Sequence, residues 1–91
     1  MKPKTIIKTD KSMTLKEMQD AVGGYIEIVY DDDEMQIICN EEGKLLELPE
    51  NEEATDMWWD MLDKQVKMDG RGTLDYLVGN VLVLKGKARM D

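Results

Sequence analysis

Histidine and phenylalanine are absent from this sequence of 91 residues, and cysteine occurs once. Without histidine, the chain lacks the base of Ser-His and Cys-His nucleophilic sites and the commonest zinc ligand. The single Cys39 cannot form an internal disulfide, and after Ile37 and Ile38 it is typical of a small buried side chain rather than a catalytic thiol. We therefore expect a protein that is not an enzyme and holds neither a metal nor a cofactor.

Long apolar runs are also missing, since no stretch approaches the roughly 18 apolar residues that span a bilayer. The first residues, Met1–Lys8, show no apolar core of a signal peptide. Positive charge is scarce: 12 basic residues against 20 acidic ones give a net charge of −8, which disfavours nonspecific binding to nucleic acids or anionic lipids. We expect a cytoplasmic protein with no direct nucleic-acid or membrane partner.

The residues that are present suffice for one folded unit. A chain of 91 residues supports one hydrophobic core but not two. Its 42% hydrophobic and 35% charged residues match a globular protein with a charged surface and not a disordered chain. Residues 1–91 are therefore expected to form a single domain.

Hydrophobic spacing predicts strands near residues 4–9, 25–30, 35–40 and 80–85, with a possible short strand at 44–48. A first helix is expected from the capping box Thr14–Glu17 to Gly23. The continuous apolar run Val81–Leu84 is typical of a strand that is covered on both sides or central in its sheet. The predicted class is α+β, in the order β-α-β-β-β-α-β, with a small mostly antiparallel sheet and two helices on one face.

A second helix is expected after Asn51, which is a plausible N-cap. Its two sides differ in polarity. The apolar side carries Ala54, Met57, Trp58, Met61, Leu62 and Gln65, and the acidic side carries Glu52, Asp56, Asp60 and Asp63. Trp59 lies on the flank, where either an edge-of-core role or contact with a base or a partner protein is open.

Several blocks of the sequence resemble a known family. They are Met18–Val29, Asn40–Leu45, Leu48–Asn51, Ala54–Thr55 and Asp75–Asn80. Together they are similar to a family of small phage and plasmid proteins that is catalogued as a domain of unknown function. The resemblance implies a mobile-element accessory protein inside a bacterial host and implies no activity.

Three local patterns have both a functional and a structural interpretation. The acidic run Asp31–Glu34 lacks the glycine and the distant glutamate of a calcium loop, so a charged hairpin turn is the favoured interpretation. Gly23–Gly24 and Gly70–Gly72 match no phosphate-binding spacing, and turn geometry explains them better. Acidic pairs capable of general acid-base work are expected by chance among so many carboxylates.

We hypothesise that the protein binds and sequesters a small nucleotide-type host signal. Lys4, Lys8, Lys85 and Lys87 would contact phosphate if the terminal strands are neighbours. The other candidate ligand-binding residues are Tyr25, Glu27, Asn40, Asn51 and Trp59, although strand packing, hairpin geometry and turn formation also explain Tyr25, Glu27 and Asn40. The site is expected at a subunit interface of a homo-oligomer.

The alternative is an acidic module that binds a host protein, as a nucleic-acid mimic or as an adaptor. Its binding residues would be Glu52, Asp56, Asp60 and Asp63, which recur along one face of the second helix. A solvated helix face explains the same row of charges. The two hypotheses differ in partner: a small nucleotide-type ligand or a basic protein surface.

Overall fold

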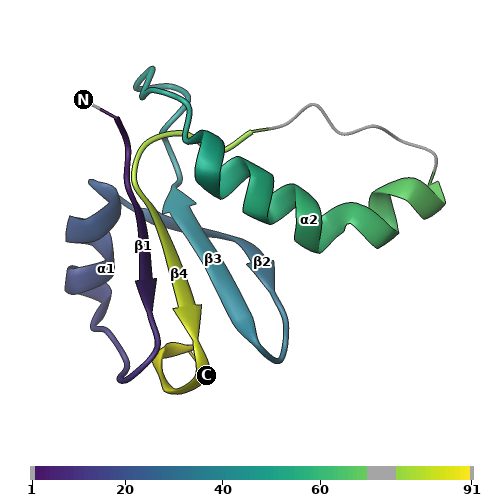
Figure 1. The fold of residues 1–91 in the computed structure, drawn as a ribbon. Helices are drawn as coiled ribbons and strands as arrows, with labels where there is room; N and C mark the ends of the chain where they lie inside the picture. Colours follow the sequence, from purple (N-terminus) through teal and green to yellow (C-terminus); the bar gives the residue numbers. More distant parts are fainter. Residues whose placement is uncertain (1, 70–75, 91) are drawn as a thin grey trace.

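The computed structural model describes residues 2–69 and 76–90, with the backbone alone over 62–69. In the described part, four strands form one mixed sheet in the order β1-β4-β3-β2. The strands are β1 (Thr5–Lys8), β2 (Ile26–Asp31), β3 (Met35–Asn40) and β4 (Val81–Lys85), and the α-helices are α1 (Leu15–Val22) and α2 (Glu52–Asp69) (Figure 1). The predicted α+β class is confirmed, and so is the succession of strands and helices apart from the short strand expected at 44–48.

The two helices pack on opposite faces of the sheet, not on one face as expected (Figure 1). Ala54 of α2 packs with Val81 and Val83 of β4, whereas Met18 of α1 packs with Leu82 of the same strand. Successive side chains of a strand point to opposite faces, so an entirely apolar strand needs cover on both. Each face of the central strands is therefore covered by one helix.

The first helix begins and ends where its capping residues predict. The Thr14 hydroxyl accepts a hydrogen bond from the Glu17 amide at 3.1 Å, and the Glu17 carboxylate accepts one from the Thr14 amide at 2.9 Å. Gly23 ends α1 with φ of 83°, a left-handed conformation that glycine adopts without strain. The reciprocal hydrogen bonds also lower the pKa of Glu17, mainly through the Thr14 amide.

The segment expected as a short strand at 44–48 is instead a run of turns. Its backbone bonds are internal: the Leu46 amide donates to Glu42 and the Leu48 amide donates to Gly43. A strand would have to give these donors to a neighbouring strand. Gly43 permits the close turn, because a Cβ there would lie 2.7 Å from the Val78 side chain.

The two terminal strands are neighbours, as the hypothesis of a basic patch required. β1 pairs in parallel with β4, with Thr5 opposite Val81 and Lys8 opposite Leu84. A short 3-10 turn, η1 (Gly86–Ala88), follows β4. No helix of the described residues is long and apolar enough to cross a membrane.

Candidate functional site

A hollow of about 500 Å³ lies on the α2 side of the sheet, beside the end of β3. Its walls come from β2, from β3 and the turn that follows it, from α2, and from residues 76–78 before β4. The polar and aromatic residues that line it are Glu27, Cys39, Asn40, Glu41, Lys44, Trp58 and Tyr76. Small-ligand sites commonly combine a concave apolar wall with a few polar groups, so this hollow is the candidate functional site.

Asn51 fixes the start of α2 against the sheet. Its buried side chain accepts a hydrogen bond from the Ala54 amide at 2.9 Å and so caps the helix, as predicted. The same side chain donates to the backbone carbonyls of Lys4 at 3.2 Å and Gly79 at 3.1 Å. One side chain therefore joins α2, β1 and the segment that leads into β4.

Thr55 holds the segment before β4 against the first turn of α2. The Leu77 amide donates to the Thr55 hydroxyl at 2.9 Å, and the Asn51 amide donates to the Leu77 carbonyl at 2.8 Å. Trp58 follows Thr55 by three residues, and residues three apart are neighbours on a helix surface. These contacts set the position of Trp58 at the hollow.

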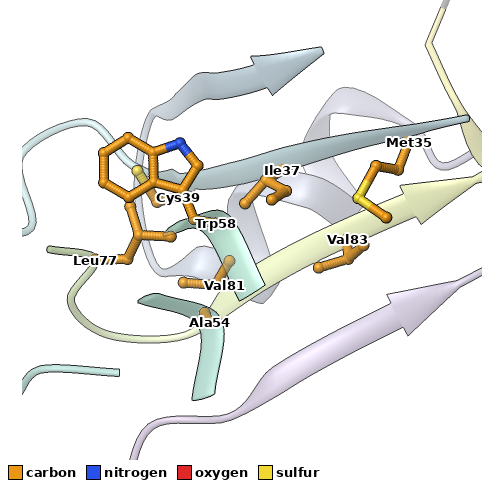
Figure 2. Close-up of a cluster of buried hydrophobic side chains, with 8 residues drawn as sticks. All are labelled: Met35, Ile37, Cys39, Ala54, Trp58, Leu77, Val81 and Val83. Carbon is orange, nitrogen blue, oxygen red and sulfur yellow. The ribbon is translucent and has the colours of Figure 1, made fainter. Parts of the chain in front are cut away.

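Trp58 has a buried indole N–H that finds no hydrogen-bond partner among the described residues. The residue is 8% exposed, and its ring packs with Ala54, Leu77 and Val81. In Figure 2 the indole nitrogen lies on the ring edge that faces away from these three residues. A buried donor without an acceptor costs about 1 to 3 kcal/mol, so it requires an explanation.

The other buried polar atom without a described partner is Nε of Arg89. Its guanidinium is nevertheless engaged, because Nη2 lies 3.1 Å from the Asp31 carboxylate in an ion pair. Trp58 has one polar atom only. Its side-chain N–H is therefore buried in the packing beside the hollow without an acceptor among the described residues.

Two interactions define the charged and aromatic parts of the hollow. The Cys39 sulfur lies 3.9 Å from the Glu27 carboxylate, a weak contact that turns a carboxylate oxygen toward the α2 side of β3. The Lys44 ammonium lies 4.6 Å from the centre of the Tyr76 ring, within the range of a cation–π interaction. The hollow therefore offers a carboxylate acceptor, a cation and an aromatic ring.

Of the predicted ligand-binding residues, Glu27 and Asn40 line this hollow. The Asn40 side chain, however, is already used within the protein. Its Nδ2 donates to the Val22 carbonyl at 3.2 Å, and its Oδ1 accepts from the Glu42 backbone amide at 2.8 Å. Asn51 is 2% exposed and is used for capping. Tyr25 is 66% exposed and lines a separate shallow hollow beside Gly23.

The four lysines proposed for phosphate contact do not converge. Lys8 ends β1 and Lys4 directly precedes it, so the two are four residues apart, or roughly 13 Å along the extended chain. Lys8 shares the α1 side with Ile6, whereas Lys85 shares the α2 side with Val83, because side chains alternate along a strand. Lys87 is exposed in η1. None of the four lines the candidate site among the described residues.

The acidic face of α2 is exposed as predicted for Glu52, Asp56 and Asp60. None of these three carboxylates forms an ion pair with another residue that the structure describes. The side chain of Asp63 lies outside the described residues, as do those of Leu62 and Gln65. Trp59 is 40% exposed and does not line the hollow.

The acidic run Asp31–Glu34 forms the predicted hairpin turn. The Asp32 carboxylate accepts from the Tyr30 hydroxyl at 2.6 Å and from the amides of Glu34 and Met35 at 2.7 and 2.8 Å. The Tyr30 hydrogen bond, followed by the two amides, lowers the pKa of Asp32. Within residues 2–69 and 76–90, no group of His, Cys, Asp or Glu is arranged to hold a metal ion. Gly70–Gly72 lie outside the described residues.

Sequence reasoning missed Lys44, Glu41 and Tyr76 as lining residues and assigned Trp58 only to the core. Lys44 and Tyr76 are 32 positions apart, so no spacing rule connects them. The available signal was the family resemblance, because both residues lie inside its blocks. Tertiary packing of the turn against residues 76–79 brings them together.

Comparison with known proteins gives a family for the chain without an activity. No curated protein and no solved structure matches it. A family model described as "Domain of unknown function (DUF3846)" matches residues 1–91. With its whole length matched, the chain belongs to this family.

Proposed function

We propose that this domain binds a small nucleotide-type ligand in the hollow without transforming it. The observation that carries the proposal is the grouping of a carboxylate (Glu27), a cation (Lys44) and an aromatic ring (Tyr76) around one hollow of about 500 Å³. Ligand pockets of this kind range from about 300 to 1,000 Å³, which accommodates a nucleoside.

The neighbouring side chains favour the nucleoside end of such a ligand. Tyr76 offers a ring on which a base can stack, and the Glu27 and Glu41 carboxylates can accept hydrogen bonds from a base or a ribose. Lys44 is the one cation among the lining residues that the structure describes. A single phosphate near Lys44 fits this charge balance better than a polyphosphate, which the two carboxylates would repel.

Binding fits the residues better than turnover does. The chain has no histidine, and its one cysteine, Cys39, is buried, whereas reactive cysteines are partly exposed. A protein of a mobile element can interfere with host signalling by sequestration alone. We place this activity in the host cytoplasm and propose that a second copy of the chain closes the open side of the hollow.

The test is thermal unfolding with mono-, di- and cyclic nucleotides, nucleosides and ADP-ribose derivatives. A ligand at 100 times its Kd should add about 2.7 kcal/mol to the free energy of unfolding. Tyr76→Ala should abolish the shift, whereas Tyr25→Ala, which changes an exposed tyrosine outside the hollow, should keep it. If no compound shifts the midpoint of the unaltered protein, the proposal fails.

The proposed assembly has its own measurement. Light scattering after size exclusion should give a mass above that of the 91-residue protomer, and ligand should increase that mass if a second copy closes the hollow. A monomer that binds ligand equally well at every protein concentration would refute the role of the second copy. It would leave ligand binding by one chain intact.

A second candidate function is binding of a basic host protein through α2. The supporting observation is the exposure of Glu52, Asp56 and Asp60 without ion pairs to described residues. Residues four apart on a helix rise by about 6 Å, which gives a row of charge comparable in scale with a phosphate chain. Neutralising all three as Glu52→Gln, Asp56→Asn and Asp60→Asn should abolish salt-sensitive capture of DNA-binding host proteins. Capture that is unchanged by the three substitutions would refute this function.

A further inference from the structure

We propose that the hollow selects nucleotides whose ring carries a permanent positive charge, such as a pyridinium or an N-alkylated purine, and that this ring replaces the Lys44 ammonium over Tyr76. The inference rests on the proposed ligand binding and names the class of ring. It follows from the contact between Lys44 and Tyr76 and from the charges of the residues that line the hollow with them.

The Tyr76 ring already holds a cation. The Lys44 ammonium lies 4.6 Å from the centre of that ring, and both residues line the hollow. The face of an aromatic ring is the negative part of its quadrupole, and proteins recognise quaternary ammonium ligands on such faces. A neutral base that stacks where the ammonium lies has to displace it, and the attraction between cation and ring is lost. A cationic ring in the same place keeps that attraction.

The other charges of the hollow favour a positive ring for a second reason. Glu27 lies opposite Cys39 in the pairing of β2 with β3, and the ladder continues to the hydrogen bond from the Glu41 amide to the Tyr25 carbonyl at 2.8 Å. Glu27 and Glu41 are therefore diagonal neighbours, with backbones roughly 7 to 8 Å apart. Both line the hollow, where Lys44 is the one cation in the described part of the wall. A cationic ring reduces this excess of negative charge, whereas a neutral ring leaves it.

The Lys44 side chain is able to leave the ring without disturbing the fold. The residue is exposed, and it belongs to a turn whose backbone bonds are internal, among them the bond from the Glu47 amide to the Lys44 carbonyl at 3.1 Å. Lysine carries its charge on a flexible stem of four carbons. Once the ring of the ligand covers Tyr76, the ammonium can move to the ligand phosphate and form a charge-assisted hydrogen bond. Binding thus exchanges one cation over the ring for another and adds an ion pair.

The experiment compares nicotinamide mononucleotide with its reduced form by isothermal titration of the full chain. The two share the ribose and the phosphate, and the reduced ring has lost its positive charge by gaining a hydride. We expect the oxidised form to bind at least about fivefold more tightly, because an exposed cation–π contact contributes about two- to fivefold and the two carboxylates add to it. The same comparison of N7-methylguanosine monophosphate with guanosine monophosphate distinguishes a purine from a pyridinium as the source of the charge.

The role of the ring is tested with Tyr76→Leu, which keeps an apolar side chain and removes the aromatic face. This variant should reduce the preference for the oxidised form to less than about threefold. Tyr25→Leu makes the same change at an exposed tyrosine outside the hollow and should keep the full preference. Tyr76 is 41% exposed, so its substitution leaves the core intact, and melting of each variant without ligand shows that it is folded.

The movement of the ammonium is tested with Lys44→Met, which keeps most of the stem and removes the charge. Nicotinamide riboside, which lacks the phosphate, should bind this variant at least as tightly as the unaltered chain, because no ammonium competes for the ring. The phosphate of the mononucleotide should tighten binding about tenfold in the unaltered chain and less than about threefold in the variant. Lys16→Met, at an exposed lysine of α1 outside the hollow, is the matched control and should change neither value.

The outcomes separate the inference from the function on which it rests. Equal binding of the charged and uncharged member of both pairs, or binding of uncharged bases alone, would overturn the selection of a positive ring and leave ligand binding standing. A full preference in Tyr76→Leu would overturn the assignment of the ring, and an unchanged contribution of the phosphate in Lys44→Met would overturn the exchange. Absence of binding by these compounds and by every other nucleotide and nucleoside would remove the proposed function and the inference together.

Discussion

The two sides of the sheet are built from the same kind of apolar residues, yet they differ in how their polar groups are satisfied. On the α1 side, Gln36 exchanges two hydrogen bonds with the backbone of Met90, at 3.0 and 2.7 Å, and Asn40 bonds to the end of α1. On the α2 side, the N–H of Trp58 remains without a described partner beside a hollow. Gln36 and Asn40 on the α1 side are therefore paired within the chain, whereas the indole N–H on the α2 side is buried without an acceptor among the described residues.

The largest predicted effects test whether the buried clusters on both faces of the sheet stabilise the fold. Trp58→Ala should lower the free energy of unfolding by about 3 to 5 kcal/mol, and Leu82→Ala on the α1 side by about 2 to 5 kcal/mol, because each leaves a cavity in a buried cluster. Chemical denaturation measures both. Asp60→Ala is the control and should cost less than about 0.5 kcal/mol. Equal midpoints for Trp58→Ala and Asp60→Ala would contradict the packing of α2 on the sheet.

An intermediate effect is expected at Asn51, where α2 is joined to β1 and to the segment before β4. Asn51→Ala should cost about 2 kcal/mol, because it removes a helix cap and leaves the buried carbonyl of Gly79 without its donor. The comparison is Thr14→Ala at the more exposed cap of α1, which should cost about 1 kcal/mol. A larger loss at Thr14 than at Asn51 would reverse this order and disprove the anchoring role.

The smallest effect concerns pH and the hairpin between β2 and β3. The Tyr30 hydrogen bond is the first cause of the lowered pKa of Asp32 and of the raised pKa of Tyr30 itself. A carboxyl group whose pKa is lower in the folded than in the unfolded chain stabilises the fold at pH values above its unfolded pKa. That stability is lost as the pH falls through its folded pKa. A phenol whose pKa is higher in the folded than in the unfolded chain stabilises the fold at pH values below its unfolded pKa. That stability is lost as the pH rises through its folded pKa.

Tyr30→Phe should therefore raise the pKa of Asp32 and move the acid loss of stability to higher pH. The measurement is an NMR titration of the Asp32 carboxyl carbon, together with unfolding at several acidic pH values. Tyr25→Phe alters an exposed tyrosine that directly precedes β2 and should leave the titration of Asp32 unchanged. An Asp32 titration that is identical with and without the Tyr30 hydroxyl would show that the backbone amides alone lower its pKa.

Local chemistry made much of the fold predictable. The Thr14–Glu17 capping box, the Gly23 terminus and the Asn51 cap act within a few residues, so their sequence signals hold in the folded chain. The run Val81–Leu84 correctly indicated a strand covered on both sides. The same run argued against placing both helices on one face, because one covered face would leave Leu82 and Leu84 in water.

The prediction of a short strand at 44–48 was wrong, for a physical reason that the sequence pattern does not show. A strand requires a partner with free backbone groups, whereas a turn satisfies its own amides within the segment, as Leu46 and Leu48 do. Leu45 is 82% exposed, so the apolar pair Leu45–Leu46 is not a buried strand face. An apolar pair beside a glycine is compatible with a strand and with a turn. The choice between them depends on whether a neighbouring strand offers free backbone groups, which the sequence pattern does not show.

The sequence by itself determined the α+β class, the capping of both helices, the acidic surface and the lack of any histidine-based chemistry, because each depends on composition or on residues close in the chain. Only the tertiary structure decided that β1 and β4 lie side by side, that their lysines diverge, and that Glu27, Lys44, Trp58 and Tyr76 surround one hollow. These four residues come from separate segments. Their meeting depends on long-range packing and on the hydrogen bonds of Asn51 and Thr55, which no local pattern encodes.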